Sequence, residues 1–218
     1  LWGRVPAEGG PMAEGAAAVH VIDDDEAVRH SLAFLFESAG LPVRAYESAP
    51  AFLRVAPGLT AGCVLTDVRM PDMDGLALQR RLAELGVRLP VIVMTGHGDV
   101  PVAVQALKAG AADFIEKPFD DDALLAAVRA ALAASRLDRE RGAEAGRVSA
   151  RLASLTPRER QVFDRLVAGQ QNKAIAQDLG SSPRTVEVHR ARVMEKMGAR
   201  NLPELVRMAL GAGPPPPE

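Results

Sequence analysis

The chain has 218 residues, a formal net charge of −2 and 48% apolar residues, enough for one large folded domain or two small ones. It contains no run of about 18 uncharged apolar residues, so we expect no membrane-spanning helix and no membrane partner. A single cysteine, Cys63, excludes an internal disulfide and the usual cysteine-based zinc sites. A cytoplasmic protein is the expectation.

Charge is divided unequally along the chain. Residues 19–136 carry 11 Lys and Arg against 16 Asp and Glu, whereas residues 147–218 carry 12 Lys and Arg against 7 Asp and Glu. An acidic first half and a basic second half indicate two domains with different partners. The basic half is a candidate for binding nucleic acid.

Both ends of the chain have a composition typical of disorder. Residues 1–18 are rich in Gly, Ala and Pro, and they lack the basic start and apolar core of a signal peptide. We expect a disordered N-terminal extension, with Met12 as a candidate for the natural first residue. Residues 213–218, with four consecutive prolines, are expected to form a disordered tail.

Short apolar runs alternate with five helical patterns through residues 19–136, and the pattern after Tyr46 is the weakest. Three of the helical patterns end at Gly40, Gly86 and Gly110, which are good helix stops. Strands that alternate with helices predict an α/β domain with a parallel, doubly wound sheet. The strands are expected at residues 19–22, 42–46, 63–66, 90–94 and 113–116.

The second half is expected to be all-helical. Residues 137–150 are charged and small without an apolar stripe, and we interpret them as a linker or a helical extension. Thr156 and Glu159 then form the capping box that opens the first of four helices. Ser182 is expected to cap a later helix, and residues 202–210 form the last one. Apolar positions at helical spacing predict the core of this domain at Ala174, Ile175, Leu179, Val186, Val193 and Met197.

Polar residues gather where the predicted strands end. Asp23 and Asp24 follow the first strand, Asp67 ends the third, Thr95 follows the fourth and Lys117 follows the fifth. Sites in doubly wound sheets form just beyond these carboxyl ends, so the five residues should converge. Grouped carboxylates favour a hard cation such as Mg²⁺, while Lys117 and Thr95 suit a phosphoryl group. The central Asp67 is the best nucleophile, and aspartyl-phosphates are an established covalent species.

Four stretches carry a resemblance to the receiver domains of bacterial two-component systems, over residues 19–136: VIDDDEAVR, LTDVRMPDMDG, MTGHGD and FIEKPF. The resemblance implies a flavodoxin-like (βα)5 fold and a phosphoryl group accepted by Asp67 from a partner histidine kinase. It implies that Asp24, Asp67 and the carbonyl of Arg69 bind Mg²⁺ directly, with Asp23 acting mainly through water.

The same resemblance implies a switch. Thr95 and Lys117 would hold the phosphoryl oxygens, and the bond between Lys117 and Pro118 is expected to be cis. Phosphorylation would draw Thr95 inward and let Phe114, an aromatic on the fifth strand, turn into the vacated space. Residues 100–109 and 113–116 with the last helix of the domain would then form a dimer face. Val104 and Lys108 are expected on that face.

The basic half reads as helix, short turn and helix, an arrangement that can place its second helix in the major groove. The stretches LTPRERQV, NKAIA and TVEVHRARVMEKM resemble the LuxR-type DNA-binding domain, over residues 151–212. Combined with the receiver, the resemblance is to response regulators of the FixJ type. In that family Glu159 pairs internally, and the last helix is the dimer contact on DNA.

By this resemblance, Glu187, Val188 and Ala191 face the edges of the bases. Glu187 could accept a hydrogen bond from cytosine N4 or pair with a nearby Arg, and His189 is as much a structural candidate as a contact. The residues expected to hold phosphates or frame the groove are Lys173, Arg184, Thr185, His189, Arg190, Arg192 and Lys196.

These features predict a phosphorylation-activated transcription factor that dimerises and binds double-stranded promoter DNA, with RNA polymerase as a further candidate partner. One alternative is a phosphohydrolase or phosphotransferase with an Asp nucleophile. That chemistry needs a general-acid Asp two residues after Asp67, where Arg69 stands instead. A second alternative is a phosphorylation-independent DNA-binding protein, against which the five intact receiver positions argue.

Overall fold

The computed structural model describes residues 17–96 and 100–211, so the predictions for residues 1–16 and for the tail at 213–218 lie outside the described residues. The chain divides into two compact units, an N-terminal unit, Leu1–Arg139, and a C-terminal unit, Glu140–Glu218.

The N-terminal unit is built on a parallel sheet of five strands in the order β2-β1-β3-β4-β5, as a doubly wound fold requires. Every predicted strand is confirmed to within one residue. Their bounds are β1 Ala18–Ile22, β2 Val43–Tyr46, β3 Gly62–Asp67, β4 Val91–Thr95 and β5 Asp113–Glu116. The helices between them are α1 Glu26–Ser38, α2 Ala49–Leu53, the 3-10 turn Ala56–Gly58, α3 Gly75–Glu84 and α4 Val100–Lys108.

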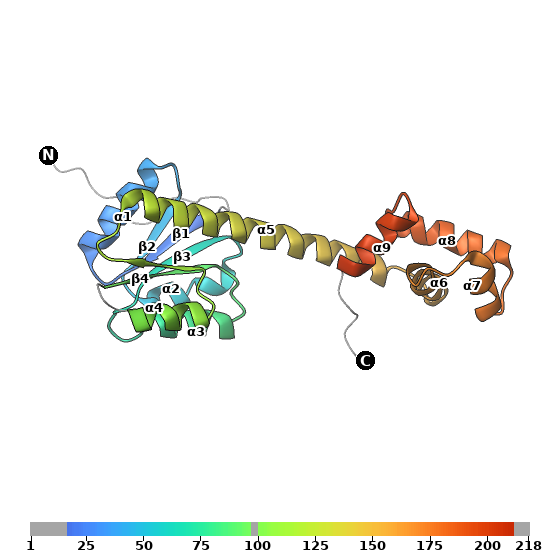
Figure 1. Ribbon diagram of the computed structural model, residues 1–218, viewed down its shortest axis with the longest axis horizontal. Coiled ribbons are helices and arrows are strands. Elements are labelled where there is room, and N and C mark those ends of the chain that lie inside the picture. The colour runs from blue at the N-terminus through green and yellow to red at the C-terminus, as the bar shows by residue number, and fades with distance from the viewer. Residues whose placement is uncertain (1–16, 97–99, 212–218) are drawn as a thin grey trace. The chain divides into compact units, whose positions relative to one another are not determined.

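Side chains of alternating strand residues fill two separate cores, one on each face of the sheet. Val19 and Val21 point to the core under α1 and α5, while Ile22 belongs to the core under α2, α3 and α4. In Figure 1, α5 runs along one face of this sheet and α3 and α4 lie against the other. Both faces are therefore covered, and the carboxyl ends of the strands are the part of the sheet left for a site.

The helix ends follow the sequence closely. Gly40, Gly86 and Gly110 all have positive φ and close the helices that they were predicted to stop. Residues 137–150, predicted to be a linker or a helical extension, lie within α5, Asp121–Ala153. The peptide bond between Lys117 and Pro118 is cis, as expected.

Up to residue 211, the C-terminal unit contains four further helices: α6 Pro157–Val167, α7 Asn172–Asp178, α8 Pro183–Met197 and α9 Leu202–Gly211. The capping box of Thr156 and Glu159 and the Ser182 cap are both present. Of the predicted core positions, Ile175, Val186, Val193 and Met197 are buried and Leu179 packs at the edge of the core. The prediction for Ala174 was wrong, because Ala174 is only half-buried and its neighbour Ala176 fills the core.

Candidate phosphorylation site and DNA-contacting helix

Four of the five predicted residues lie close together at the edge where the strands of the sheet end. Three of them, Asp23, Asp67 and Lys117, form one polar network, and Thr95 lies beside it. Asp23 leaves β1, Asp67 is the last residue of β3, Thr95 is the last residue of β4 and Lys117 follows β5. Because β3 lies between β1 and β4, Asp67 occupies the centre of this edge. The fifth predicted residue, Asp24, is exposed next to Asp23.

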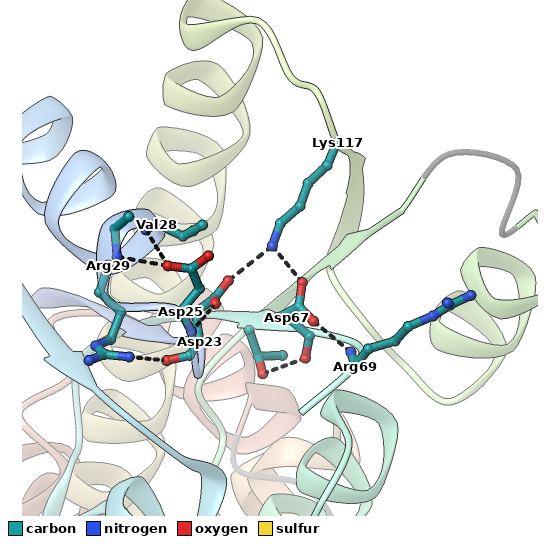
Figure 2. A network of polar contacts seen from close by, with 9 residues as sticks. Asp23, Asp25, Val28, Arg29, Asp67, Arg69 and Lys117 are labelled. Atoms are coloured by element: carbon teal, nitrogen blue, oxygen red, sulfur yellow. Dashed lines mark hydrogen bonds and ion pairs between the residues drawn. The ribbon is translucent and has the colours of Figure 1, made fainter. Parts of the chain in front are cut away.

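Lys117 holds the network together (Figure 2). Its Nζ donates hydrogen bonds to Asp67 Oδ1 at 2.6 Å and to Asp23 Oδ2 at 2.9 Å. The side chains of Asp23 and Asp67 are only 2% and 13% exposed, so each charge needs a partner. Burial opposes the charge on Lys117, but the hydrogen bonds to the two carboxylates outweigh it and raise the lysine pKa. Lys117 therefore stays charged at neutral pH.

Asp67 has a second partner from its own loop. The backbone N–H of Arg69 donates to Asp67 Oδ2 at 2.6 Å, which fixes the plane of the carboxylate. The position two residues after Asp67 thus contributes a backbone group to the site. Thr95 is 2% exposed at the end of β4, and its backbone carbonyl accepts from the N–H of Lys117 at 2.7 Å. The strand ends that carry Thr95 and Lys117 are accordingly held side by side.

The three consecutive aspartates have different surroundings. Asp25 is the N-cap of α1, and its side chain accepts from the N–H groups of Ala27 and Val28. Asp23 is buried beside Lys117, and Asp24 is exposed. One aspartate starts the helix, one belongs to the buried network, and one is left at the surface.

The donor set suits a hard cation. Within residues 17–96 and 100–211, no three His, Cys, Asp or Glu side chains are arranged to hold a metal ion by themselves. The expected set needs only Asp24 and Asp67 with the Arg69 carbonyl, and water can supply the remaining oxygens, as Mg²⁺ commonly keeps several waters. These oxygen donors fit Mg²⁺, and the negative charge exceeds the one cation that Lys117 supplies.

The predicted dimer face is exposed and, apart from Lys108, apolar. Phe114 is 38% exposed on β5, and Val104 is 44% exposed on α4. Lys108 is exposed at the end of α4. Leu107, 45% exposed and three residues after Val104, extends the same helix surface.

Helix α8 presents most of its predicted DNA-contacting residues to solvent. Its amino end is closed by Ser182, whose hydroxyl lies 2.8 Å from that of Thr185. Val188 is 48% exposed, so an apolar side chain is available for the edge of a base. Glu187 makes no ion pair within the described residues. The predicted contacts that are exposed are Lys173, Arg184, Thr185, Glu187, Val188, Ala191 and Arg192.

Three of the predicted contacts are only partly exposed, and two of them bond other residues of the protein. Arg190 is half-buried and donates to Asn172 Oδ1 at 3.2 Å. His189 is half-buried, and its Nδ1 has no hydrogen-bond partner in the part of the chain that the structure describes. Lys196 donates to Glu159 Oε2 at 2.6 Å, an ion pair that confirms the predicted internal pairing of Glu159.

Comparisons with known proteins decide the family. A model of the response regulator receiver domain matches residues 19–129, and a model of the bacterial regulatory proteins of the luxR family matches residues 153–209. The transcriptional regulatory protein FixJ of Azorhizobium caulinodans is 60% identical over 198 residues, covering 91% of this chain and 94% of that protein. The chain belongs to the FixJ-type response regulators. A receiver domain joined to a LuxR-type helix-turn-helix makes it a phosphorylation-dependent regulator of transcription.

Other relatives agree with this FixJ-type assignment. FixJ of Rhizobium meliloti is 54% identical, covering 89% of this chain and 96% of that protein. Among solved structures, the response regulator StyR is 38% identical with a TM-score of 0.80, covering 89% of this chain and 98% of StyR. Full-length FixJ from B. japonicum is 51% identical with a TM-score of 0.57, covering 91% and 98%.

The family sets the coarse chemistry of this FixJ-type chain. Receiver domains generally bind Mg²⁺ at the phosphorylation site, and the two domains imply a histidine-kinase partner and DNA. None of the helices in the described ranges combines the length and the apolar character needed to cross a bilayer.

Sequence reasoning missed several residues of the site. Asp25 was not singled out, although an Asp directly before a helical pattern is a common N-cap. Arg29 donates from α1 to the backbone carbonyl of Asp23 at 2.8 Å, and no motif signals that bond. Leu107 could have been found from its spacing to Val104 on α4.

Proposed function

We propose that Asp67 accepts a phosphoryl group from a histidine kinase and that this event controls binding of the C-terminal unit to promoter DNA. The observation that carries the proposal is the position of Lys117, whose Nζ contacts the carboxylates of both Asp67 and Asp23. Because Nζ already contacts both carboxylates, it can pair with a phosphoryl group on Asp67 and keep its contact with Asp23.

The transfer itself needs little from the protein besides positioning and charge. One oxygen of Asp67 forms a bond to phosphorus while the nitrogen–phosphorus bond of the kinase phosphohistidine breaks, and the histidine leaves. Lys117 and Thr95 hold the phosphoryl oxygens. Asp24, Asp67 and the Arg69 carbonyl would hold Mg²⁺, with Asp23 acting through water; when bound, the ion offsets negative charge on the transferring group.

An enzyme acting on small substrates with the same nucleophile is less well supported. Arg69 occupies the place of the required general acid, and its N–H is bonded to Asp67 Oδ2. A guanidinium stays protonated at all working pH values, so it cannot exchange protons with a leaving group.

Phosphorylation would act on the face made by α4 and β5. Thr95 moves toward the phosphoryl group, and Phe114 turns from its exposed position into the space behind Thr95. With Phe114 withdrawn, Val104, Leu107 and Lys108 form a surface on which two copies pair. Burying exposed Val and Leu side chains supplies the driving force for this homodimer.

The dimer would place two DNA-binding units on one operator, so the second contact gains effective concentration. We assign Glu187, Val188 and Ala191 to base edges. Phosphate or groove contacts are assigned to Lys173, Arg184, Thr185 and Arg192. Weaker candidates are Arg190 and Lys196, which bond Asn172 and Glu159, and His189, whose side chain is half-buried. The bacterial cytoplasm, where promoter DNA and RNA polymerase lie, is the proposed compartment.

The test is solution mass by light scattering, with Mg²⁺ and beryllofluoride, a stand-in for the phosphoryl group, added or omitted. Wild type should shift from monomer to dimer, and Asp67→Asn should not. Asp72→Asn is the matched control, because Asp72 is an exposed aspartate of the same loop and should shift like wild type. An identical mass in all samples, or a dimer that ignores Asp67→Asn, contradicts the proposal.

A further inference from the structure

The backbone around Asp24 is held on both sides, although its side chain is exposed. On one side, the carbonyl of Asp23 accepts a hydrogen bond from Arg29 Nη1 at 2.8 Å. On the other, the N–H of Asp25 donates to Asp23 Oδ1 at 2.9 Å. The two peptide units that join Asp24 to the chain are therefore each fixed by one bond.

Asp23 has every polar group in use. Its N–H donates to the carbonyl of Tyr46 at 3.3 Å, and its Oδ2 accepts from Lys117. Its Oδ1 and carbonyl are the two groups bonded to Asp25 and Arg29. Turning Asp23 toward a metal would break one of these bonds, although its oxygens can still accept from a water on the ion. The exposed Asp24 is the neighbouring carboxylate that can reach the ion directly without such a loss.

Arg29 is itself well anchored. It lies in the first turn of α1, where its backbone N–H donates to the carbonyl of Asp25 at 3.0 Å. Asp25 caps the same turn through Ala27 and Val28. Arg29 is half-buried, and its guanidinium reaches the loop from a helix rather than from a second loop. Groups supported on helices hold a site more accurately than groups on loops.

We infer that Arg29 is a positioning residue for the metal site: by holding the Asp23 carbonyl, it orients Asp24 toward the cation. The inference rests on the proposed function, since it takes Asp24 as a direct ligand. Partners behind a ligand commonly change metal affinity about 10–100-fold when they are removed. Arg29 acts through a backbone carbonyl, so an effect near the lower end is expected.

The sign of the effect separates positioning from simple electrostatics. Removing a positive charge near a cation site should tighten Mg²⁺ binding if charge alone matters. Removing a residue that orients a ligand should weaken it. A residue with a purely structural role would lower the melting temperature and leave the affinity of the folded protein unchanged.

The experiment is isothermal titration of Mg²⁺ into the full chain. Arg29→Met should weaken binding about tenfold, and Arg29→Lys, which keeps the charge and one donor, should restore part of it. Arg88→Met is the matched control, because Arg88 is exposed just before β4, at the opposite edge of the sheet, and should bind like wild type. Exchange of the Asp25 amide, followed by NMR, should become faster in Arg29→Met, since its acceptor is carried by the loosened loop.

Unchanged or tighter Mg²⁺ binding by Arg29→Met, with binding lost in Asp24→Asn, overturns the positioning role and leaves the proposed function intact. Unchanged binding by both Asp24→Asn and Asp67→Asn overturns the metal site of the proposed function, and the role of Arg29 falls with it. If Arg29→Met does not fold, Arg29→Lys carries the same test: weaker binding supports the inference, and wild-type affinity contradicts it.

Discussion

Each unit contains a lysine that bonds a buried carboxylate from a distant part of the chain. In the N-terminal unit, Lys117 contacts Asp23 and Asp67, which lie 94 and 50 positions away. In the C-terminal unit, Lys196 contacts Glu159, 37 positions away, at the same 2.6 Å that separates Lys117 from Asp67. The two contacts have the same length, yet only one belongs to a site that can do chemistry.

The difference lies in what surrounds each lysine. Lys196 and Glu159 match one charge to one, and the same Glu159 oxygen, Oε2, also accepts from the N–H of Thr156 as half of a capping box. Lys117 supplies one charge to an edge that carries Asp23, Asp67 and the exposed Asp24. Excess negative charge at an open edge can take up a cation, whereas a neutral pair at a helix start is complete.

Removing Lys117 gives the largest expected effect on function. Lys117→Met should lower the rate of labelling by a small phosphodonor roughly a hundredfold, because one charge that stabilises the transferring phosphoryl group is lost. Mg²⁺ affinity should not fall, since the edge becomes more negative. The labelling rate checks the first expectation and Mg²⁺ titration checks the second. Lys108→Met, at an exposed lysine, is the control. Equal loss of labelling in Lys108→Met would show that the effect is not specific to the network.

Removing Lys196 should instead act on stability. Lys196→Met leaves Glu159, 4% exposed, without its cation, and the melting temperature of the C-terminal unit should fall by roughly 5–10 °C. The Lys196 side chain is 34% exposed, so water offsets part of the loss. The double variant with Glu159→Gln should recover some stability. Scanning calorimetry of the full chain measures all three proteins.

The same variant tests whether Lys196 contacts DNA. A phosphate contact contributes about one unit to the slope of log affinity against log salt. If the ion pair with Glu159 persists on DNA, Lys196→Met leaves that slope unchanged, while the exposed Arg192→Met reduces it. A reduced slope in Lys196→Met would mean that the lysine exchanges Glu159 for a phosphate.

The two units should also lose stability in different pH windows. His20 is 1% exposed in β1, and its burial, aided by the charge of Arg44, lowers its pKa from 6.5 to about 4. Between these values the unfolded chain takes up a proton on His20 and the folded chain does not. The free energy of unfolding of the N-terminal unit should therefore fall as pH drops from 6.5 to 4, by up to about 3 kcal/mol.

Glu159 loses its stabilising effect at a lower pH than His20 does. The hydrogen bond from Lys196, followed by that from the Thr156 N–H, lowers the Glu159 pKa from 4.5 to about 2. Its stabilisation is complete above pH 4.5 and is lost only as pH falls toward 2. Hydrogen exchange with mass spectrometry on the full chain, between pH 7 and 4, should show the N-terminal unit losing protection first. His20→Phe, which keeps the ring beside Tyr46 and Phe52, should remove that early loss.

The contrast explains why one network was predictable from the sequence and the other only in part. Parallel strands in a doubly wound sheet end at one edge, so topology alone brings Asp23, Asp67, Thr95 and Lys117 together. The bounds of the three inner strands, β1, β3 and β4, could also be predicted, because their apolar runs are buried on both faces of the sheet. The bond from Arg29 to the loop lay beyond the sequence, since it depends on a rotamer and a distance.

Helical residues are harder to place from a pattern. The position of Lys196 in the sequence suits a contact with the DNA groove. Whether the side chain faces DNA or Glu159 depends on its direction around the axis of α8, which the pattern does not give. Ala174 and Ala176 show the same limit, because both fit the short helix α7 and its packing against the core of the C-terminal unit buries only Ala176. The pattern fixes which residues are helical, and tertiary contacts fix the facing direction.

Two glycines, Gly75 and Gly142, differ in the space around them, and adding a single methyl group at each extends the comparison. A Cβ on Gly75, the first residue of α3, would lie 2.4 Å from the backbone oxygen of Asp67. Gly75→Ala should cost about 1–3 kcal/mol and displace the phosphorylation site, because backbone must move. Gly142 sits in α5 with nothing within 4 Å of an added Cβ, so Gly142→Ala should add about 0.5–1 kcal/mol of stability.

Calorimetry of both glycine variants gives the stability, and labelling by a small phosphodonor reports on the site. Gly75→Ala should lower the labelling rate while Gly142→Ala leaves it at the wild-type value. A Gly75→Ala protein that labels normally would mean that the Asp67 loop absorbs the added methyl group, and the site would then tolerate more movement than its short bonds to Lys117 and Arg69 imply. Impaired labelling would show that the open edge depends on close backbone packing behind Asp67, a requirement that the closed pair of Lys196 and Glu159 lacks.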